Sequence, residues 1–241
     1  MIHRLGIESV PVDECSDGGG VAADKSTVER VPSAGLASCN LFSTRLSCLP
    51  LILASTSSIR RHMLEAAGVE FKTVPSNFDE STAKAKGIPP DQLAAALAAA
   101  KAESISAARP DDWVIGSDSV VAVEGRIFDK PAGRMDAAEH LRFFSGKEMQ
   151  LTSAVALARG GAVDWRHVET ARLEVRPFSD AFIRDYLDAE WPEVGYTVGV
   201  FRLEARGVQL FERIDGDHFT ILGMPLIPLL GALRARGQLL A

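Results

Sequence analysis

Apolar residues follow two different spacings along most of the chain. The short apolar run at 51–54 predicts a buried strand, and the hydroxyl-rich segment 55–58 predicts the N-terminal cap of a helix over 59–67 that ends at Gly68. An Ala- and Leu-rich segment opened by a proline predicts a second helix over 90–108. Because strand and helix patterns alternate, we predict an α/β fold in which a mixed, partly parallel central sheet carries helices on both sides.

The second half of the chain continues this alternation. A strongly apolar strand is expected over 112–123, with a turn at Glu124 and Gly125. Asp136 and Glu139 have the spacing of a capping box, which predicts a helix that ends near residue 145. The remaining expected elements are strands over 151–158, 168–175 and 208–214 and helices over 180–190 and 225–236.

Composition and charge limit what the protein can do. The 241-residue chain is 46% hydrophobic and 24% charged, values of an ordinary globular protein, and its formal net charge is −6. This acidic balance offers no general attraction for a nucleic acid polymer or an anionic membrane surface, so a nucleotide would have to be held by a specific site. No apolar run approaches the ~20 residues that a membrane-spanning helix needs.

Residues 1–48 differ from the rest of the sequence. They are rich in Ser and Gly and show no sustained strand or helix period, so we expect a flexible N-terminal extension followed by one domain over 49–241. The three cysteines, Cys15, Cys39 and Cys48, all lie in this extension. With no disulfide framework, no zinc-ligand spacing and no secretion signal, the expected compartment is the cytoplasm.

The first candidate for chemistry is the turn between the first expected strand and helix. A helix N-terminus presents free backbone N–H groups and the positive end of the helix dipole, and Ser55, Arg60 and Arg61 surround it here. The turn therefore suits a phosphate or another anion. A capped surface helix with solvated arginines explains the same residues without any ligand.

Two charged residues fall where apolar ones are expected. Lys101 lies on the same helical stripe as Leu93 and Leu97, so its stem either extends outward to water or brings the ammonium to a partner. Asp118 interrupts the apolar strand, where a carboxylate must bind a metal, pair with a cation or accept several hydrogen bonds. Both are candidate site residues, and a structural ion pair is the alternative for Asp118.

Further polar groups stand at the ends of expected elements, among them Glu80, Lys130 and Lys147. Each of them alone is typical of a turn or a solvated surface. Together they supply carboxylates for a hard divalent cation and ammonium groups for a triphosphate.

Several of these segments occur in the order found in Maf-like nucleoside triphosphate pyrophosphatases, which the sequence resembles from about residue 50 to the C-terminus. The segments are ASTSSIRRHMLEAAGV, the pair Asp79 and Glu80, Lys101 with Ala102, IGSDSVV, Asp129-Lys130-Pro131 and FFSGK. The tail VGVFRLEARGVQLFERIDGDHFTILGMPLIPLL looks like the family branch that acts on 7-methyl-GTP. Glu204 keeps the Phe-basic-x-Glu pattern of that branch.

The resemblance implies two lobes around a cleft, often assembled as a homodimer, and metal-dependent cleavage between the α- and β-phosphates of a nucleoside triphosphate. The products would be a nucleoside monophosphate and pyrophosphate. Asp118 matches the family's proton acceptor, and Glu80 matches the acidic residue near the metal, which would be Mg²⁺ or Mn²⁺ with Asp118 as a second ligand. The groups expected to hold the phosphates are Ser55, Arg60, Arg61, Lys101, Lys130 and Lys147.

The sequence departs from the family pattern at positions linked to base choice. Ile59 replaces the aromatic residue usual in the 7-methyl-GTP branch, and Ser119 replaces a Gln or Thr. A separate, smaller departure lies in an expected strand, where Thr152-Ser153-Ala154-Val155 replaces the more usual Thr-Gly-Val. An aliphatic side chain lacks the cation–π attraction of an aromatic ring for a methylated, cationic purine. A dTTP/UTP pyrophosphatase of the same family is therefore the alternative.

Two other functions are disfavoured by the residues themselves. An aspartyl-nucleophile phosphatase needs a second Asp two residues after the first, and none follows Asp118. A non-catalytic nucleotide-binding regulator of cell division would not need the full set of candidate catalytic groups, which is present.

Overall fold

The computed structural model describes residues 50–76, 78–80 and 87–240. The extension predicted for residues 1–48 lies outside the described residues, so the fold below is that of the following domain. No helix in these described ranges has both the length and the apolar character needed to cross a membrane.

A seven-stranded sheet forms the centre of the domain, in the order β2-β1-β3-β5-β6-β7 with β4 paired to β3. The β2-β1 and β1-β3 pairs are parallel and the other pairs are antiparallel. The mixed sheet predicted from the sequence is therefore confirmed. Its strands are β1 (Leu51–Leu53), β2 (Lys72–Thr73), β3 (Trp113–Val123), β4 (Arg126–Phe128), β5 (Glu148–Arg159), β6 (Ala162–Val175) and β7 (Phe211–Asp215).

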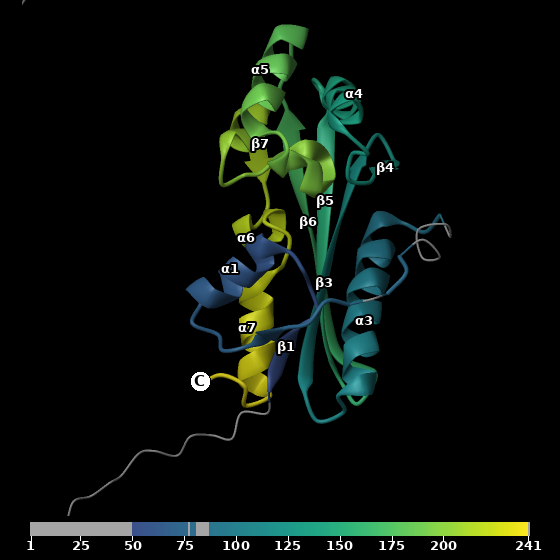
Figure 1. The fold of residues 1–241 in the computed structure, drawn as a ribbon, viewed down its shortest axis with the longest axis vertical. Helices are drawn as coiled ribbons and strands as arrows, with labels where there is room; N and C mark the ends of the chain where they lie inside the picture. Colours follow the sequence, from purple (N-terminus) through teal and green to yellow (C-terminus); the bar gives the residue numbers. More distant parts are fainter. Residues whose placement is uncertain (1–49, 77, 81–86, 241) are drawn as a thin grey trace, which may run out of the picture. The chain divides into compact units, whose positions relative to one another are not determined.

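Helices cover both faces of the sheet, as expected. In the lower half of the view in Figure 1, α3 lies on one side of the sheet and α1 with α7 on the other, while α4 and α5 lie at the upper end. The helices are α1 (Ser58–Ala66), α3 (Pro90–Ala108), α4 (Arg134–Phe144), α5 (Asp180–Glu190), α6 (His218–Ile221) and α7 (Leu226–Ala235), with 3-10 helices η1 (Glu193–Tyr196), η2 (Val198–Val200) and η3 (Arg206–Leu210).

The apolar core divides the domain into two lobes. One cluster of buried residues joins α4 and α5 to the ends of β5 and β6 nearest them. Two further clusters fill the other lobe, one between the sheet and α1 with α7, the other between the sheet and α3. The long strands β3 and β5 contribute to cores in both lobes and connect them, which fits the two-lobed fold that the resemblance implies.

A glycine lets α3 lie directly on β3. A Cβ atom at Gly116 would stand 2.1 Å from the backbone oxygen of Ala98 and 2.7 Å from the backbone nitrogen of Ala102, distances that no side chain can occupy. The close approach brings Lys101, one residue before Ala102, next to Asp118, two residues after Gly116.

Two sequence predictions about element ends were wrong. Asp136 and Glu139 do not cap α4, because the helix already begins at Arg134 after Gly133, and the carboxylate of Asp136 reaches back to the N–H of Ala132 at 2.8 Å. The strand predicted over 208–214 starts only at Phe211.

The late start of that strand has a packing cause. Residues Arg206–Leu210 form a 3-10 helix, because the chain folds back so closely that a Cβ at Gly207 would lie 2.4 Å from the backbone oxygen of Arg202. An extended strand through Gly207 could not make that approach.

Candidate active site

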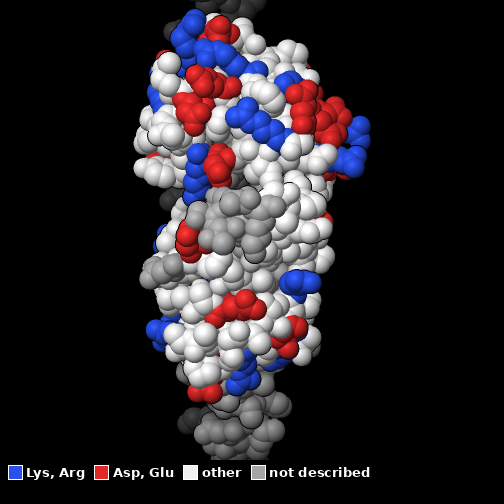
Figure 2. Space-filling view, turned by 90° about the vertical axis from the view of Figure 1, so that its right-hand side faces the viewer, with Lys and Arg blue, Asp and Glu red and all other residues white. Residues whose placement is uncertain are grey.

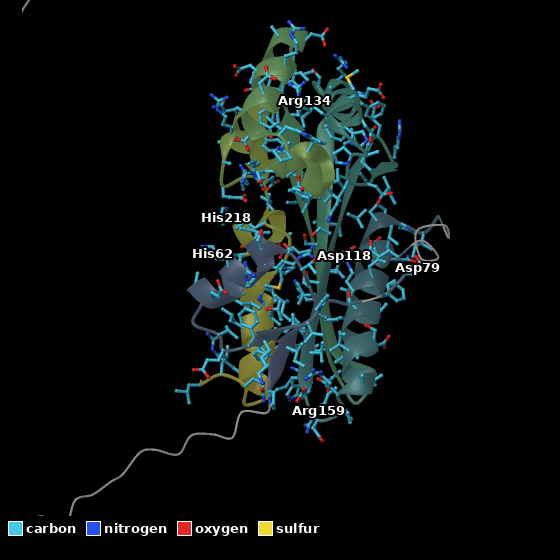
Figure 3. All side chains as sticks on the ribbon, in the orientation of Figure 1. His62, Asp79, Asp118, Arg134, Arg159 and His218 are labelled. Carbon is cyan, nitrogen blue, oxygen red and sulfur yellow. The ribbon has the colours of Figure 1, made fainter. Side chains whose placement is uncertain are left out.

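A cavity of about 740 Å³ opens beside β3 and is lined by residues of both lobes. Figure 3 labels Asp118 near the middle of β3, between α1 on one side and α3 on the other. The start of α1, the middle of α3, the segment 193–204 and the turn after α6 supply the other walls. The volume lies within the usual range for small-molecule sites.

Lys101 and two carboxylates form the charged centre of this cavity. The Lys101 Nζ donates to Oδ1 of Asp118 at 2.6 Å and lies 2.7 Å from Oε1 of Glu80. Only 12% of the Lys101 side chain and 13% of the Asp118 side chain are exposed. The ammonium that interrupts the apolar stripe of α3 therefore meets partners in the cleft.

Arg60 supplies a second cation from the first turn of α1. The Ser57 hydroxyl caps this helix by accepting from the backbone N–H of Arg60. The guanidinium donates through Nε to the backbone oxygen of Gly223 at 2.8 Å and through Nη2 to the Ser119 hydroxyl at 3.0 Å. Burial lowers the pKa of Arg60, while the carboxylates of Asp118 and Glu80 raise it. The side chain stays cationic, because an arginine is not deprotonated in proteins.

The structure brings most of the predicted site residues into one place. The cavity is lined by Lys101, Asp118 and Glu80 at its charged centre and by further predicted residues around them, namely Ser55, Ile59, Arg60, Ser119, Lys130 and Glu204.

Two predicted phosphate-binding residues do not line the cavity. Arg61 is exposed on α1, where its Nε lies 3.7 Å from Oε1 of Glu65. The Lys147 Nζ donates to Oε2 of Glu124 at 2.9 Å and lies 3.6 Å from the centre of the Phe143 ring, in the other lobe.

Sequence reasoning missed several cavity residues. The backbone oxygen of Gly223 holds Arg60 although 163 residues separate the two. Tyr196, on η1, lines the cavity with 68% of its surface exposed. The signal for Gly223 is its φ of +109°, a backbone conformation that glycine adopts most readily, but this becomes visible only in the fold.

The site's cations do not belong to a broad basic surface on the face next to α3. In Figure 2, blue and red side chains are interspersed over the part of this face that the structure describes. Several of the arginines in the lobe of α4 and α5 pair with carboxylates, among them Arg142 with Asp180 and Arg134 with Asp188. The described part of this face therefore offers no broad basic patch to an anion.

The carboxylates of the cavity suit a divalent metal ion only if a bound polyphosphate supplies further oxygen ligands. Asp118 and Glu80 both contact the Lys101 ammonium, so their oxygens face a common point. Within the described ranges, no group of three or more His, Cys, Asp or Glu side chains is placed to hold a metal ion. Mg²⁺ usually binds one or two carboxylates and completes its shell with substrate phosphates and water. The pair is therefore a suitable donor set for Mg²⁺ beside a polyphosphate.

Fold and cavity together define a two-lobed α/β protein whose cleft holds paired carboxylates beside buried cations. Comparison with known proteins identifies its family. The Maf family, described as "Maf-like protein", matches residues 50–236, and the chain belongs to this family.

Curated relatives cover the same region at high identity. The chain is 47% identical to a 7-methyl-GTP pyrophosphatase of Rhizobium etli over 78% of its own length and 97% of the relative. It is 46% identical to a nucleoside triphosphate pyrophosphatase of Sphingopyxis alaskensis (78% and 98%). It is 47% identical to a protein of the same name from Granulibacter bethesdensis (77% and 96%). These relatives carry two names at nearly equal identity, so identity alone does not indicate the base.

Proposed function

We propose that this protein hydrolyses a nucleoside triphosphate between the α- and β-phosphates and releases a nucleoside monophosphate and pyrophosphate. The observation that carries the proposal is the placement of Asp118, Lys101 and Arg60 in one cavity of a Maf-family chain. Relatives that are 46–47% identical carry pyrophosphatase names.

The cations of the cavity would hold the triphosphate. Arg60 and Lys101 are largely buried, where an ionic contact is screened less by solvent than at the surface, and Lys130 lies at the rim. Ser55 stands before α1, whose free backbone N–H groups favour an anion. Arg61 and Lys147 are left out of this proposed set because neither lines the cavity.

Asp118 would act as the general base. Its largely buried carboxylate lines the cavity, where it could take a proton from the attacking water at one of its oxygens. Lys101 would shift from this carboxylate toward the phosphates as they bind and stabilise the charge that develops on the leaving pyrophosphate. Glu80 and Asp118 would hold Mg²⁺, or Mn²⁺ in its place, which when bound supplies charge neutralisation for the phosphate oxygens.

The part of the cavity lined by the segment 193–204 suits a base that carries positive charge. Arg202 is paired with the buried Glu190 at 2.9 Å, and this hydrogen bond raises the pKa of Arg202, with smaller contributions from Glu204 and Glu193. One guanidinium is therefore paired with one carboxylate and feels the charge of two more. Burial, followed by the nearby Glu190, raises the pKa of Tyr186 in the same cluster.

The carboxylates of this part of the cavity bear on which base the substrate carries. Glu193 and Glu204 line the cavity together with the exposed ring of Tyr196. Carboxylates and an aromatic face attract a methylated, cationic purine and offer nothing comparable to a neutral pyrimidine. We therefore favour 7-methyl-GTP or a similar modified nucleotide over dTTP and UTP.

The setting of the enzyme follows from the substrate and the family resemblance. We propose a cytoplasmic location, because the proposed substrate is drawn from the cell's pool of nucleoside triphosphates. The resemblance supports a homodimer, and light scattering on the purified full-length chain would test it by giving twice the 25.9 kDa of one copy.

Direct product analysis tests the proposed reaction. The full-length protein is incubated with Mg²⁺ and, separately, 7-methyl-GTP, GTP, dTTP or UTP, and pyrophosphate and orthophosphate are quantified. We expect pyrophosphate and the nucleoside monophosphate, with 7-methyl-GTP turned over fastest. Orthophosphate as the first product would indicate a phosphatase, although the position two residues after Asp118 is the buried Val120. Nucleotide binding without any product would indicate a regulator.

A further inference from the structure

Two serines on neighbouring strands link Arg60 to Thr220 in α6. Ser119 on β3 and Ser153 on β5 are register partners in the sheet, and their hydroxyl oxygens lie 2.8 Å apart. The Ser119 oxygen also lies 3.0 Å from Nη2 of Arg60. Ser119 occupies a position that the family resemblance associates with base choice, yet its hydroxyl is engaged by an arginine.

The protons of these groups can be assigned. The Ser153 hydroxyl donates its single proton to the backbone oxygen of Thr220 at 2.7 Å, so it accepts from Ser119. Ser119 in turn accepts from Arg60, because a guanidinium only donates. The hydrogen bonds therefore run in one direction, from Arg60 through Ser119 and Ser153 to Thr220.

The turn that follows α6 holds Arg60 at a second point. Its Nε donates to the backbone oxygen of Gly223, three residues after Thr220. Gly223 has a φ of +109°, and a Cβ there would lie 3.3 Å from the Ser119 oxygen and 3.5 Å from Nε of Arg60. Two anchors fix the plane of the guanidinium, and the N–H groups not used by these anchors remain for the cavity that Arg60 lines.

We propose that Ser119 and Ser153 are positioning residues for Arg60, and that Ser119 acts on phosphate binding rather than on the choice of base. A guanidinium that is already oriented loses less conformational freedom when an anion binds, so affinity for the phosphate chain rises. The inference rests on the proposed function in one respect, namely that the bound anion is the phosphate chain of a substrate.

Binding of inorganic tripolyphosphate tests the inference, since this probe has no base. Isothermal titration calorimetry compares wild-type protein with Ser119→Ala, Ser119→Thr and Ser153→Ala. We expect Ser119→Ala to weaken binding about tenfold, as for the loss of one hydrogen bond to a charged group. Ser119→Thr should restore most of the affinity because it keeps the hydroxyl. Ser153→Ala should have an intermediate effect, because Ser119 can donate to Gly223 at 3.2 Å instead.

Two further measurements separate a positioning role from other roles. In an Arg60→Ala background, adding Ser119→Ala should cause no further loss of tripolyphosphate affinity, since the two side chains act through one contact. In steady-state assays, Ser119→Ala should raise KM by the same factor for 7-methyl-GTP and GTP, with a smaller change in kcat. Thermal melts of all variants serve as the folding control.

Several outcomes would overturn the inference. One is unchanged tripolyphosphate affinity in Ser119→Ala combined with a changed ratio of kcat/KM between nucleotides, which would make Ser119 a base-choice residue. A second is that Ser119→Ala lowers tripolyphosphate affinity by the same factor in the wild-type and Arg60→Ala backgrounds. A third is that the wild-type protein does not bind tripolyphosphate. Failure of the proposed function would give a different result. The protein would release no pyrophosphate, while Ser119→Ala would still weaken tripolyphosphate binding.

Discussion

The two ends of the cavity are built in different ways. At the proposed phosphate end, Lys101 and Asp118 are about seven-eighths buried and lie on α3 and β3. Lys101 is bound by carboxylates there, and Arg60 donates to Gly223 and Ser119. At the proposed base end, Tyr196 and Glu204 are exposed and lie on a short 3-10 helix and a connecting segment. Catalysis needs charges that are already oriented, which rigid elements provide.

The base end needs access and specificity more than rigidity. Binding residues on connecting segments can change without disturbing the core. In this arrangement the proposed base end can change while the residues proposed to hold the phosphates stay in place. The following predictions test this separation, beginning with the largest expected effect.

The strongest test removes the charge of Asp118. Asp118→Asn keeps the shape of the side chain but not the basic oxygen, so kcat should fall by about 10³-fold, within the range for loss of a general base. The fold should survive, because the Lys101 ammonium keeps its contact with Glu80 at 2.7 Å. Pyrophosphate release and a thermal melt are measured on the same sample.

The control for this variant is Asp188→Asn, which removes an exposed carboxylate paired with Arg134. It should leave both measurements nearly unchanged. If Asp118 were only half of a buried ion pair, Asp118→Asn would instead destabilise the fold by about 3–5 kcal/mol with no loss of turnover per folded molecule.

Lys101 gives the next largest effect. Lys101→Met keeps an unbranched stem among Leu93 and Leu97 but removes the ammonium, so kcat/KM should fall roughly 10²-fold for every nucleotide, as when one preorganised donor is lost. Steady-state kinetics with 7-methyl-GTP and GTP measure it. If Lys101→Met changed the ratio of kcat/KM between the two nucleotides, the separation of the cavity into a phosphate end and a base end would be contradicted.

The sequence singled out Lys101 and Asp118 because their signals are local. A lysine on the apolar stripe of α3 and an aspartate inside the apolar strand β3 each stand out within a short window, and packing at Gly116 then brings them together. The bounds of α3 were likewise predictable from its opening proline and its Ala- and Leu-rich run.

The rest of the site could not be predicted because its contacts join distant segments. Arg60 reaches a backbone oxygen of Gly223, and no side-chain pattern encodes that acceptor. Tyr196 lies on a one-turn 3-10 helix with no apolar period to fix its position. The family resemblance predicted Glu204 as a site residue. It did not predict that Glu193 and the Arg202–Glu190 pair lie near it.

The base end should show a smaller and more selective effect. Tyr196→Leu removes the aromatic face, so the ratio of kcat/KM for 7-methyl-GTP over GTP should fall about tenfold, the size of a cation–π contribution near 1.4 kcal/mol. Tyr196→Phe keeps the face and is the matched control, with a ratio close to that of the wild type. Equal losses for both nucleotides in Tyr196→Leu would argue against a role in base choice.

The smallest effects are expected at Arg61 and Lys147, the two predicted phosphate-binding residues that do not line the cavity. Arg61 forms an exposed ion pair with Glu65 at 3.7 Å, and such pairs contribute about 0–1 kcal/mol to stability. Lys147 is engaged by Glu124 and the ring of Phe143 in the other lobe. Arg61→Ala and Lys147→Ala should therefore each keep kcat/KM within about twofold of the wild type, since neither removes a charge from the phosphate end. A loss of tenfold or more in Arg61→Ala, with an unchanged melting temperature, would show that the substrate draws this guanidinium in from the surface and that the phosphate end extends along the next residue of α1.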